Sequence, residues 1–297
     1  MTTVAEAPPR IGLAAGAAAA TVVLWASSFV AIRHVGTQIS AGPLSLARLG
    51  LGSVFLGALL VKRQQPAVQR WPVRRDWLPL IACGVLWFGV YNLALNEAER
   101  RLDAGTAAML VHIAPLLIAV LAGLGLGEGF PRQLVIGGLV AFAGIVVIGT
   151  STSSGRAETW GVVLCVVAAI SYAVGVVTQK PLLSRLPAAE VTWLACTIGA
   201  VVCLPFAPTL VEEVRAADAA TIWWVVYLAA FPTALGFTTW AFALRRTSAG
   251  QMGVTVYAVP VVAIVLAWLS LGEAPTALAL AGGALCLAGV AISRRTA

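Results

Sequence analysis

Charged residues are scarce in this chain: Asp, Glu, Lys and Arg make up 10% of its 297 residues, whereas 60% are hydrophobic. The mean hydropathy of +0.94 lies far outside the balance of a soluble domain. Apolar runs recur along the chain, and most reach the roughly 20 residues that a helix needs to cross about 30 Å of hydrocarbon. We therefore expect an all-α membrane protein, with the lipid bilayer around it and no soluble domain.

Several chemical signatures are also missing. The five cysteines have no Cys-x-x-Cys spacing and no clustered histidines beside them, so no metal site and no cofactor are expected. The chain has no Gly-x-x-x-x-Gly-Lys-[Ser/Thr] loop and no His-Glu-x-x-His, which excludes a nucleotide-driven pump within this chain and weighs against an enzyme. The net charge of +7 comes from turns between apolar runs, where basic residues set topology, so no nucleic-acid partner is expected.

Carboxylates are absent from the middle of the apolar runs, because all twelve acidic residues fall in turns or near helix ends. Proton-driven exporters of cationic drugs commonly use a buried carboxylate that alternates between proton and substrate, since a charge at that depth is costly and kept for function. The absence disfavours this mechanism and favours facilitated diffusion. Proton exchange linked to His112 remains the alternative.

The apolar runs predict ten spans, at 11–32, 41–61, 77–95, 105–124, 134–148, 160–179, 191–207, 222–243, 250–271 and 277–292. The first run is longer than the apolar region of a signal peptide, which favours a span over a cleaved leader. The densest basic cluster, Lys62 to Arg75, follows the second run and belongs in the cytoplasm by the positive-inside rule. Both terminal tails, 1–10 and 294–297, are then cytoplasmic.

One stretch of the chain occurs twice, at a shift of 145 residues. Gly105 to Val147 aligns without a gap on Gly250 to Ile292, which places Pro115 on Pro260 and His112 on Tyr257. The chain thus reads as two related halves, 11–150 and 160–293, joined by the linker 151–159. Five helices per half make the halves enter the membrane from opposite sides, and such inverted repeats suit alternating access.

These motifs resemble the drug/metabolite transporter superfamily, EamA type, over residues 11–292. The residues that carry the resemblance are Trp25-Ala-Ser-Ser-Phe29, Arg48, Pro115, Pro260 and the repeated Leu-Gly-Glu at 126–128 and 271–273. Within the superfamily, the chain most resembles the YddG-type amino-acid exporters. The resemblance implies ten helices around a central cavity, with the fifth and tenth at the periphery, in the bacterial inner membrane. It also implies a small-molecule substrate, amino acids, and we expect a monomer or weak oligomer.

Candidate substrate contacts are polar or aromatic side chains deep in the spans. They are Trp25, Ser28, Trp87, Tyr91, Asn92, His112, Tyr172 and Tyr257, with Pro115 and Pro260 as bends. Aromatic faces and free carbonyls could hold the ammonium group of an amino acid, and Asn, Tyr or Ser donors its carboxylate. Structural roles stay open: interhelical hydrogen bonds for Asn92 and Asn96, packing for the aromatic residues, and a packed His112 bonded to a free carbonyl.

Four charged residues have no settled role. Arg48 lies about 10 Å into its span, where it could snorkel outward or pair with Glu97, Glu99 or Asp103. Only Arg48 and Lys180 are candidate cations for the cavity, which argues against phosphorylated cargo. Glu128 and Glu273 read as capping residues or, alternatively, gating contacts. We therefore expect a secondary transporter that exports neutral and aromatic amino acids or similar metabolites, with a proton-coupled drug/metabolite antiporter or a channel-like pore as alternatives.

Overall fold

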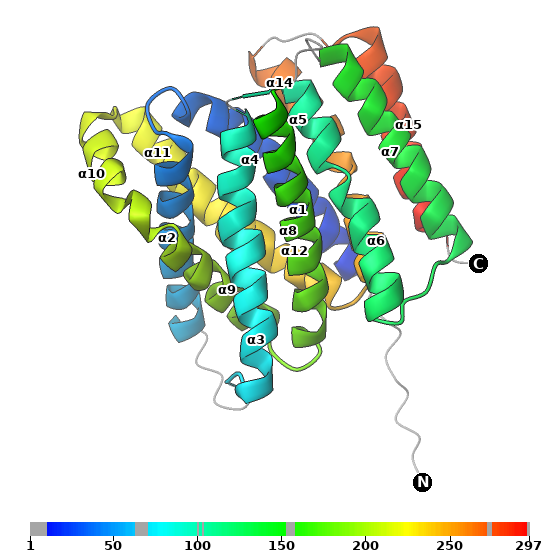
Figure 1. Cartoon of the computed structure of the whole chain (residues 1–297), viewed down its shortest axis with the longest axis horizontal. Coiled ribbons are helices and arrows are strands. Elements are labelled where there is room, and N and C mark those ends of the chain that lie inside the picture. The colour runs from blue at the N-terminus through cyan, green and yellow to red at the C-terminus, as the bar shows by residue number, and fades with distance from the viewer. Residues whose placement is uncertain are drawn as a thin grey trace.

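In the computed structural model, residues 11–62, 71–99, 101–102, 104–152, 158–271 and 275–295 are described, and they form the helical bundle of Figure 1. The predicted N-terminal tail, most of the predicted linker, and Asp103 and Glu273 lie outside these residues. The elements in chain order are α1 (Ile11–Val35), α2 (Ala41–Lys62), α3 (Arg74–Ala82), η1 (Cys83–Val90), α4 (Tyr91–Glu99), α5 (Ala104–Val111), α6 (Ala114–Gly125), α7 (Arg132–Thr152), α8 (Thr159–Leu182), α9 (Ala188–Val202), η2 (Leu204–Phe206), α10 (Ala207–Ala216), α11 (Ala219–Leu228), η3 (Ala229–Leu235), α12 (Gly236–Leu244), α13 (Ala249–Thr255), α14 (Ala258–Leu271) and α15 (Ala277–Ser293).

Within the described part of the chain, seven helices are long and apolar enough to cross a membrane. An eighth is added if α9 and α10, which bend by 53° at η2, count as one span. Met109–Gly125 and Ala277–Ser293 are shorter apolar helices. Leu124, Trp223 and Leu269 are each more than 70% exposed, as expected for side chains that face lipid. The protein is therefore a multi-pass membrane protein, while the count of ten spans and the placement of the termini remain predictions.

Two helices break at the repeat-related prolines. Because Pro115 has no N–H, the i→i−4 ladder stops between α5 and α6, and Leu116 N bonds Ile113 O at 3.0 Å instead. The same change to three-residue spacing occurs between α13 and α14 before Pro260, where Tyr257 N bonds Val254 O at 3.1 Å. The breaks expose main-chain groups inside the bundle, at matching places in the two halves.

Two other helices carry π-helical stretches, η1 and η3. A shift of 145 residues moves η1 (Cys83–Val90) onto η3 (Ala229–Leu235) within one residue. Helix α2 packs on η3, and helix α9 packs on η1. The contacts are thus reciprocal between the halves, since the same shift carries α2 onto α9. Widened turns of this kind frequently occur at functional sites.

Helices α7 and α15 cross at the edge of the molecule with their backbones in contact (Figure 1). A Cβ atom added to Gly144 would lie 2.5 Å from Gly282 O, and one added to Gly137 would lie 2.5 Å from Gly289 O. The start of α7 therefore meets the end of α15, so the two helices are antiparallel. Close approach through small residues is how helices associate where lipid removes the hydrophobic drive.

Candidate functional site

Aromatic side chains fill the middle of the bundle. They come from α1, the η1–α4 region, α8 and α12, and they are Trp25, Trp87, Phe88, Tyr91, Tyr172, Phe237 and Trp240. Trp87 stacks on Tyr172 with ring centroids 5.3 Å apart, and Trp25 stacks on Trp240 at 5.1 Å. Gly175 lets α8 approach, because a Cβ there would lie 2.4 Å from Trp87 Cβ. We call these seven residues the aromatic cluster.

Polar atoms in and beside this cluster are buried without partners. Trp25 Nε1 and Tyr172 Oη bond no other residue within the described ranges. Trp240 Nε1 donates to Gln179 Oε1 at 3.2 Å, which leaves Gln179 Nε2 unpaired within those ranges as well. A buried polar group without a partner costs about 1–3 kcal/mol, so we expect such atoms to bind water or a ligand. All three groups can donate, which suits the oxygens of a carboxylate or carbonyl.

The other predicted polar residues of this region form hydrogen bonds within the protein. Asn92 Nδ2 donates to Phe88 O at 2.8 Å within its own helix, so it supports the π-helical stretch rather than another span. Ser28 Oγ donates to Trp25 O at 2.6 Å. Asn96 Nδ2 reaches α2 and donates to Ser45 Oγ at 3.0 Å, which is the interhelical bond expected for an asparagine in hydrocarbon.

His112 and Tyr257 lie apart from the aromatic cluster, at the two helix breaks. Tyr257 is fully buried, and its hydroxyl donates to His112 O at 3.0 Å. Their rings are parallel within 29°, with centroids 6.2 Å apart. This bond joins the side chain at one helix break to the main chain at the other. That carbonyl can accept the bond because Leu116 N, its partner in an unbroken helix, bonds Ile113 O instead at the break before Pro115.

The structure therefore divides the predicted contacts into two groups, with Trp25, Trp87, Tyr91 and Tyr172 in one and His112 and Tyr257 in the other. Sequence reasoning missed Gln179, Phe237 and Trp240. Gln179 and Trp240 lie near span ends, where polar and aromatic residues usually serve as interface anchors. Phe237 looks like any core phenylalanine. The hydrogen bond from Trp240 to Gln179 could not be predicted from the sequence of either helix alone, because it depends on how α8 and α12 pack together.

Hydrogen bonds hold one end of the bundle together, and those of Glu128 join the two halves. Glu128, in the turn after α6, accepts hydrogen bonds from Ala249 N at 2.7 Å and Gly250 N at 3.1 Å, at the start of α13. It is a capping residue, one of the two roles expected for it. Lys180 Nζ donates to Leu244 O at 2.6 Å and also to Thr247 O, which satisfies carbonyls at the end of α12.

The opposite end is hollowed. A cavity of about 400 Å³ lies between the α1–α2 turn, α4 and α10, lined by Ile32, Gly36, Thr37, Gln38, Ile39, Ser40, Ala41, Leu44, Asn96 and Glu213. Glu213 is held in its wall by Ser40, whose N and Oγ donate to the carboxylate at 2.9 and 2.7 Å. None of the seven residues of the aromatic cluster lines this cavity.

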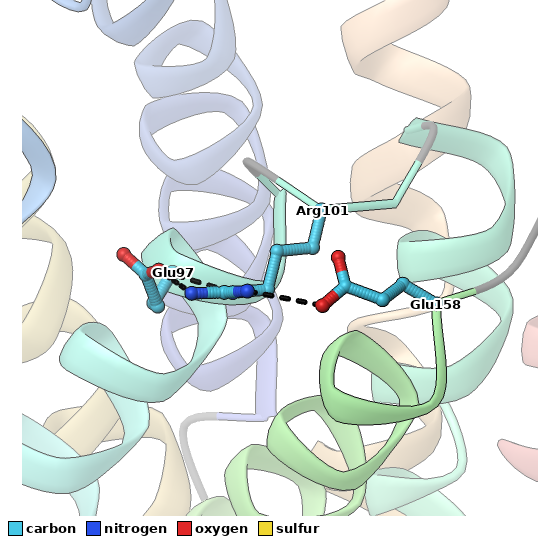
Figure 2. Close-up of polar contacts among 3 residues, drawn as sticks. All are labelled: Glu97, Arg101 and Glu158. Atoms are coloured by element: carbon cyan, nitrogen blue, oxygen red, sulfur yellow. Dashed lines mark hydrogen bonds and ion pairs between the residues drawn. The ribbon is translucent and has the colours of Figure 1, made fainter.

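An ion-pair cluster links helices at the same end. Figure 2 shows Arg101 between two carboxylates, with Nη2 2.8 Å from Glu97 and Nη1 3.0 Å from Glu158. Hydrogen bonds to Glu97 and then Glu158 raise the pKa of the Arg101 guanidinium. The cluster ties the end of α4 to the start of α8. Glu97 is thereby committed to Arg101, not to Arg48.

No three His, Cys, Asp or Glu side chains in the described part of the chain gather closely enough to hold a metal ion. Asp76 is the acidic residue there with a fully buried side chain, and it pairs with Arg185 at 2.8 Å. Within the same ranges, the aromatic cluster therefore includes no carboxylate.

Comparison with known proteins gives a consistent result. The sequence profile of the EamA-like transporter family matches residues 12–150 and 159–295. The "Probable terminal-alkyne amino-acid exporter" of Streptantibioticus cattleyicolor is 39% identical over 289 residues, which cover 97% of this chain and 95% of that protein. The "Probable amino-acid metabolite efflux pump" of Salmonella typhimurium is 27% identical over 296 residues, covering 93% and 95%. A protein of known crystal structure shares the fold, with a TM-score of 0.77, 20% identity and coverage of 95% and 96%.

Proposed function

Because this chain belongs to the EamA-like transporter family, we propose that it exports neutral and aromatic amino acids, or similar small metabolites, across the bacterial inner membrane. The observation that carries the proposal is the aromatic cluster with its unpaired donors. Aromatic faces attract ammonium groups and apolar side chains. The donors of Trp25, Tyr172 and Gln179 match the oxygens of a carboxylate.

The similar proteins support the substrate class. Two of them carry names that describe export of amino acids or amino-acid metabolites. An amino acid with a terminal alkyne has a slim, apolar side chain, which aromatic faces can bind without a charged partner. We extend the same class of substrate to this chain.

Transport by alternating access follows from the two halves. We propose ten spans in two inverted five-helix repeats, residues 11–150 and 160–293, with both termini in the cytoplasm. In that orientation the cavity opens away from the cytoplasm, and the contacts of Glu128 and Lys180 close the cytoplasmic end. If contacts at the cytoplasmic end break while equivalent contacts form at the opposite end, the aromatic cluster would be exposed to each side of the membrane in turn.

Facilitated diffusion is the proposed mode. A proton-coupled exporter with a carboxylate mechanism needs an acidic group that reaches both substrate and proton. In the described ranges Asp76 is buried but paired with Arg185, away from the aromatic cluster. Proton exchange through His112 is the second mode, favoured by the burial of that titratable ring at a helix break.

A competition panel tests the substrate class. Purified protein in liposomes would be assayed for uptake of labelled phenylalanine in the presence of other amino acids, quaternary-ammonium drugs or sugar nucleotides. We expect neutral and aromatic amino acids to compete and the other two classes to have little effect. Competition by the drugs alone would contradict the proposal and favour the antiporter alternative.

A further inference from the structure

Arg48 of α2 is a buried cation with unused hydrogen-bonding capacity. Its side chain is 9% exposed, and Nε donates to Thr233 Oγ1 at 3.1 Å. Across the described ranges, the structure shows no hydrogen bond or ion pair at the two terminal nitrogens. A charge at this depth is costly, and it is usually kept where it serves a substrate or an ion.

Snorkelling does not account for this arginine. A snorkelling arginine carries its guanidinium to the interface, whereas Thr233 lies in η3, in the middle of its span, and holds the guanidinium inward. The repeat-related position is Trp193 in α9, which packs against the main hydrophobic core. The equivalent contact between α9 and η1 is therefore made without a charge at that position.

The location of Arg48 links the cavity to the aromatic cluster. Ala41 and Leu44 line the cavity, and Arg48 follows on the same face of α2, about 6 Å further into the membrane than Leu44. Tyr91, a member of the aromatic cluster, is within electrostatic range of the guanidinium. A molecule passing from the cluster to the cavity would meet Arg48 between them.

Glu213 does not neutralise this arginine. Its carboxylate is bonded to Ser40, eight residues before Arg48 on the chain and about 12 Å away along α2. The amide of Asn96, which also lines the cavity, donates to Ser45. The free edge of the guanidinium is therefore available to an anionic group that enters from outside the protein.

We propose that Arg48 binds the carboxylate of the transported amino acid, one helical turn deeper in the membrane than the cavity lining at Leu44. The proposal rests on the proposed function and adds the residue that recognises the carboxylate. The two terminal nitrogens would donate to the two carboxylate oxygens, while the bond from Nε to Thr233 keeps the planar group oriented. The substrate would leave the donors of the aromatic cluster for Arg48 as the protein opens to the cavity.

The test compares a carboxylate with its neutral isostere. Full-length protein in liposomes would take up labelled L-phenylalanine in competition with unlabelled L-phenylalanine or L-phenylalaninamide, which keeps the ring and the ammonium group. In the wild type we expect the acid to inhibit at a concentration about tenfold lower than the amide, since charge-assisted bonds to arginine are lost in the amide. In Arg48→Gln the ratio should fall to about twofold or less, and Arg48→Lys should lie between.

Two further variants distinguish carboxylate binding by Arg48 from the loss of any positive charge and from a failure to fold. Arg246→Gln removes an exposed cation in the turn after α12, whose guanidinium lies over Phe242, and it should keep the wild-type ratio. Thr233→Val keeps the charge of Arg48 but removes the hydrogen bond that orients its guanidinium. The half-saturating concentration for phenylalanine should therefore rise several-fold, while the turnover rate changes less. If Arg48→Gln fails to fold, Arg48→Lys and Thr233→Val still decide.

Equal inhibition by acid and amide in the wild type would overturn the role of Arg48 and leave amino-acid transport standing. A wild-type ratio retained in Arg48→Gln would overturn it as well. Absence of any phenylalanine-inhibited uptake in the wild type would instead contradict the proposed function.

Discussion

The hydroxyl of Tyr257 donates to the main-chain carbonyl of His112 at 3.0 Å, and the two residues are 145 positions apart, the shift that superposes the two halves of the sequence. A second pair has the same separation, because Cys286 Sγ donates to Ala141 O at 3.4 Å. A residue can contact its own counterpart in the other half only close to the axis that relates the two halves. These two pairs therefore lie near that axis.

Loss of the Tyr257 hydroxyl should destabilise the protein. Tyr257→Phe removes the side-chain donor to the His112 carbonyl, which Leu116 N does not bond at the helix break, and we expect a loss of about 0.5–2 kcal/mol. The measurement is thermal unfolding in detergent, followed with a thiol-reactive dye, since the described cysteines are free and buried. His112→Gln keeps the carbonyl and is the matched control. An unchanged midpoint for Tyr257→Phe would contradict this role.

Tyr172→Phe should behave in the opposite way. Tyr172 Oη is buried and unpaired within the described ranges, so its removal should change stability by no more than about 0.5 kcal/mol, or increase it. If that hydroxyl serves the substrate, the half-saturating concentration for phenylalanine should rise several-fold. The same dye assay and a transport assay separate the two effects. A marked fall in stability with unchanged transport would assign the hydroxyl to the scaffold.

The crossing of α7 and α15 makes a steric prediction. Gly144→Ala would place a Cβ 2.5 Å from Gly282 O, and overpacking of this kind costs about 1–3 kcal/mol. Gly138→Ala, on the same helix, has its nearest neighbour at 3.4 Å and should be neutral or slightly stabilising. Unfolding midpoints of the two variants would be compared directly. Equal midpoints would show that the helices separate easily at this crossing.

The parts of the fold that follow from local rules could be predicted from the sequence. Apolar length predicts spans, and the prolines and glycines repeated at 145 residues indicate matching breaks and close contacts. The π-helical stretches and the bend at η2 could not, because each depends on packing against another helix. The partners of Arg48 and Trp240 were out of reach for the same reason, since both lie on distant spans.

Asp218 makes the stability of one end depend on pH. Its carboxylate accepts from Thr221 N at 2.7 Å as the N-cap of α11, and from Gln38 Nε2 at 2.8 Å. The bond from Thr221, followed by that from Gln38, lowers the pKa of Asp218 below its ordinary value of 3.8. A lowered folded-state pKa means that the stabilisation is complete above the unfolded value and is lost as pH falls through the folded one.

Asp218→Asn is the matched variant, because asparagine keeps the cap and cannot ionise. We expect the wild type to unfold at a higher temperature than this variant at pH 6, and the gap to close as the pH is lowered toward 3. Unfolding midpoints over this pH series check the prediction. A gap that stays constant would mean that the ionised form of Asp218 contributes nothing.

The most direct test of the whole account is counterflow in liposomes. Vesicles containing the purified protein would be loaded with unlabelled phenylalanine, and uptake of labelled phenylalanine would be followed at equal pH and with an imposed pH gradient. Alternating access without proton coupling predicts saturable uptake that internal substrate accelerates and that the gradient leaves unchanged. Uptake that requires the gradient, or that neither saturates nor responds to internal substrate, would contradict it.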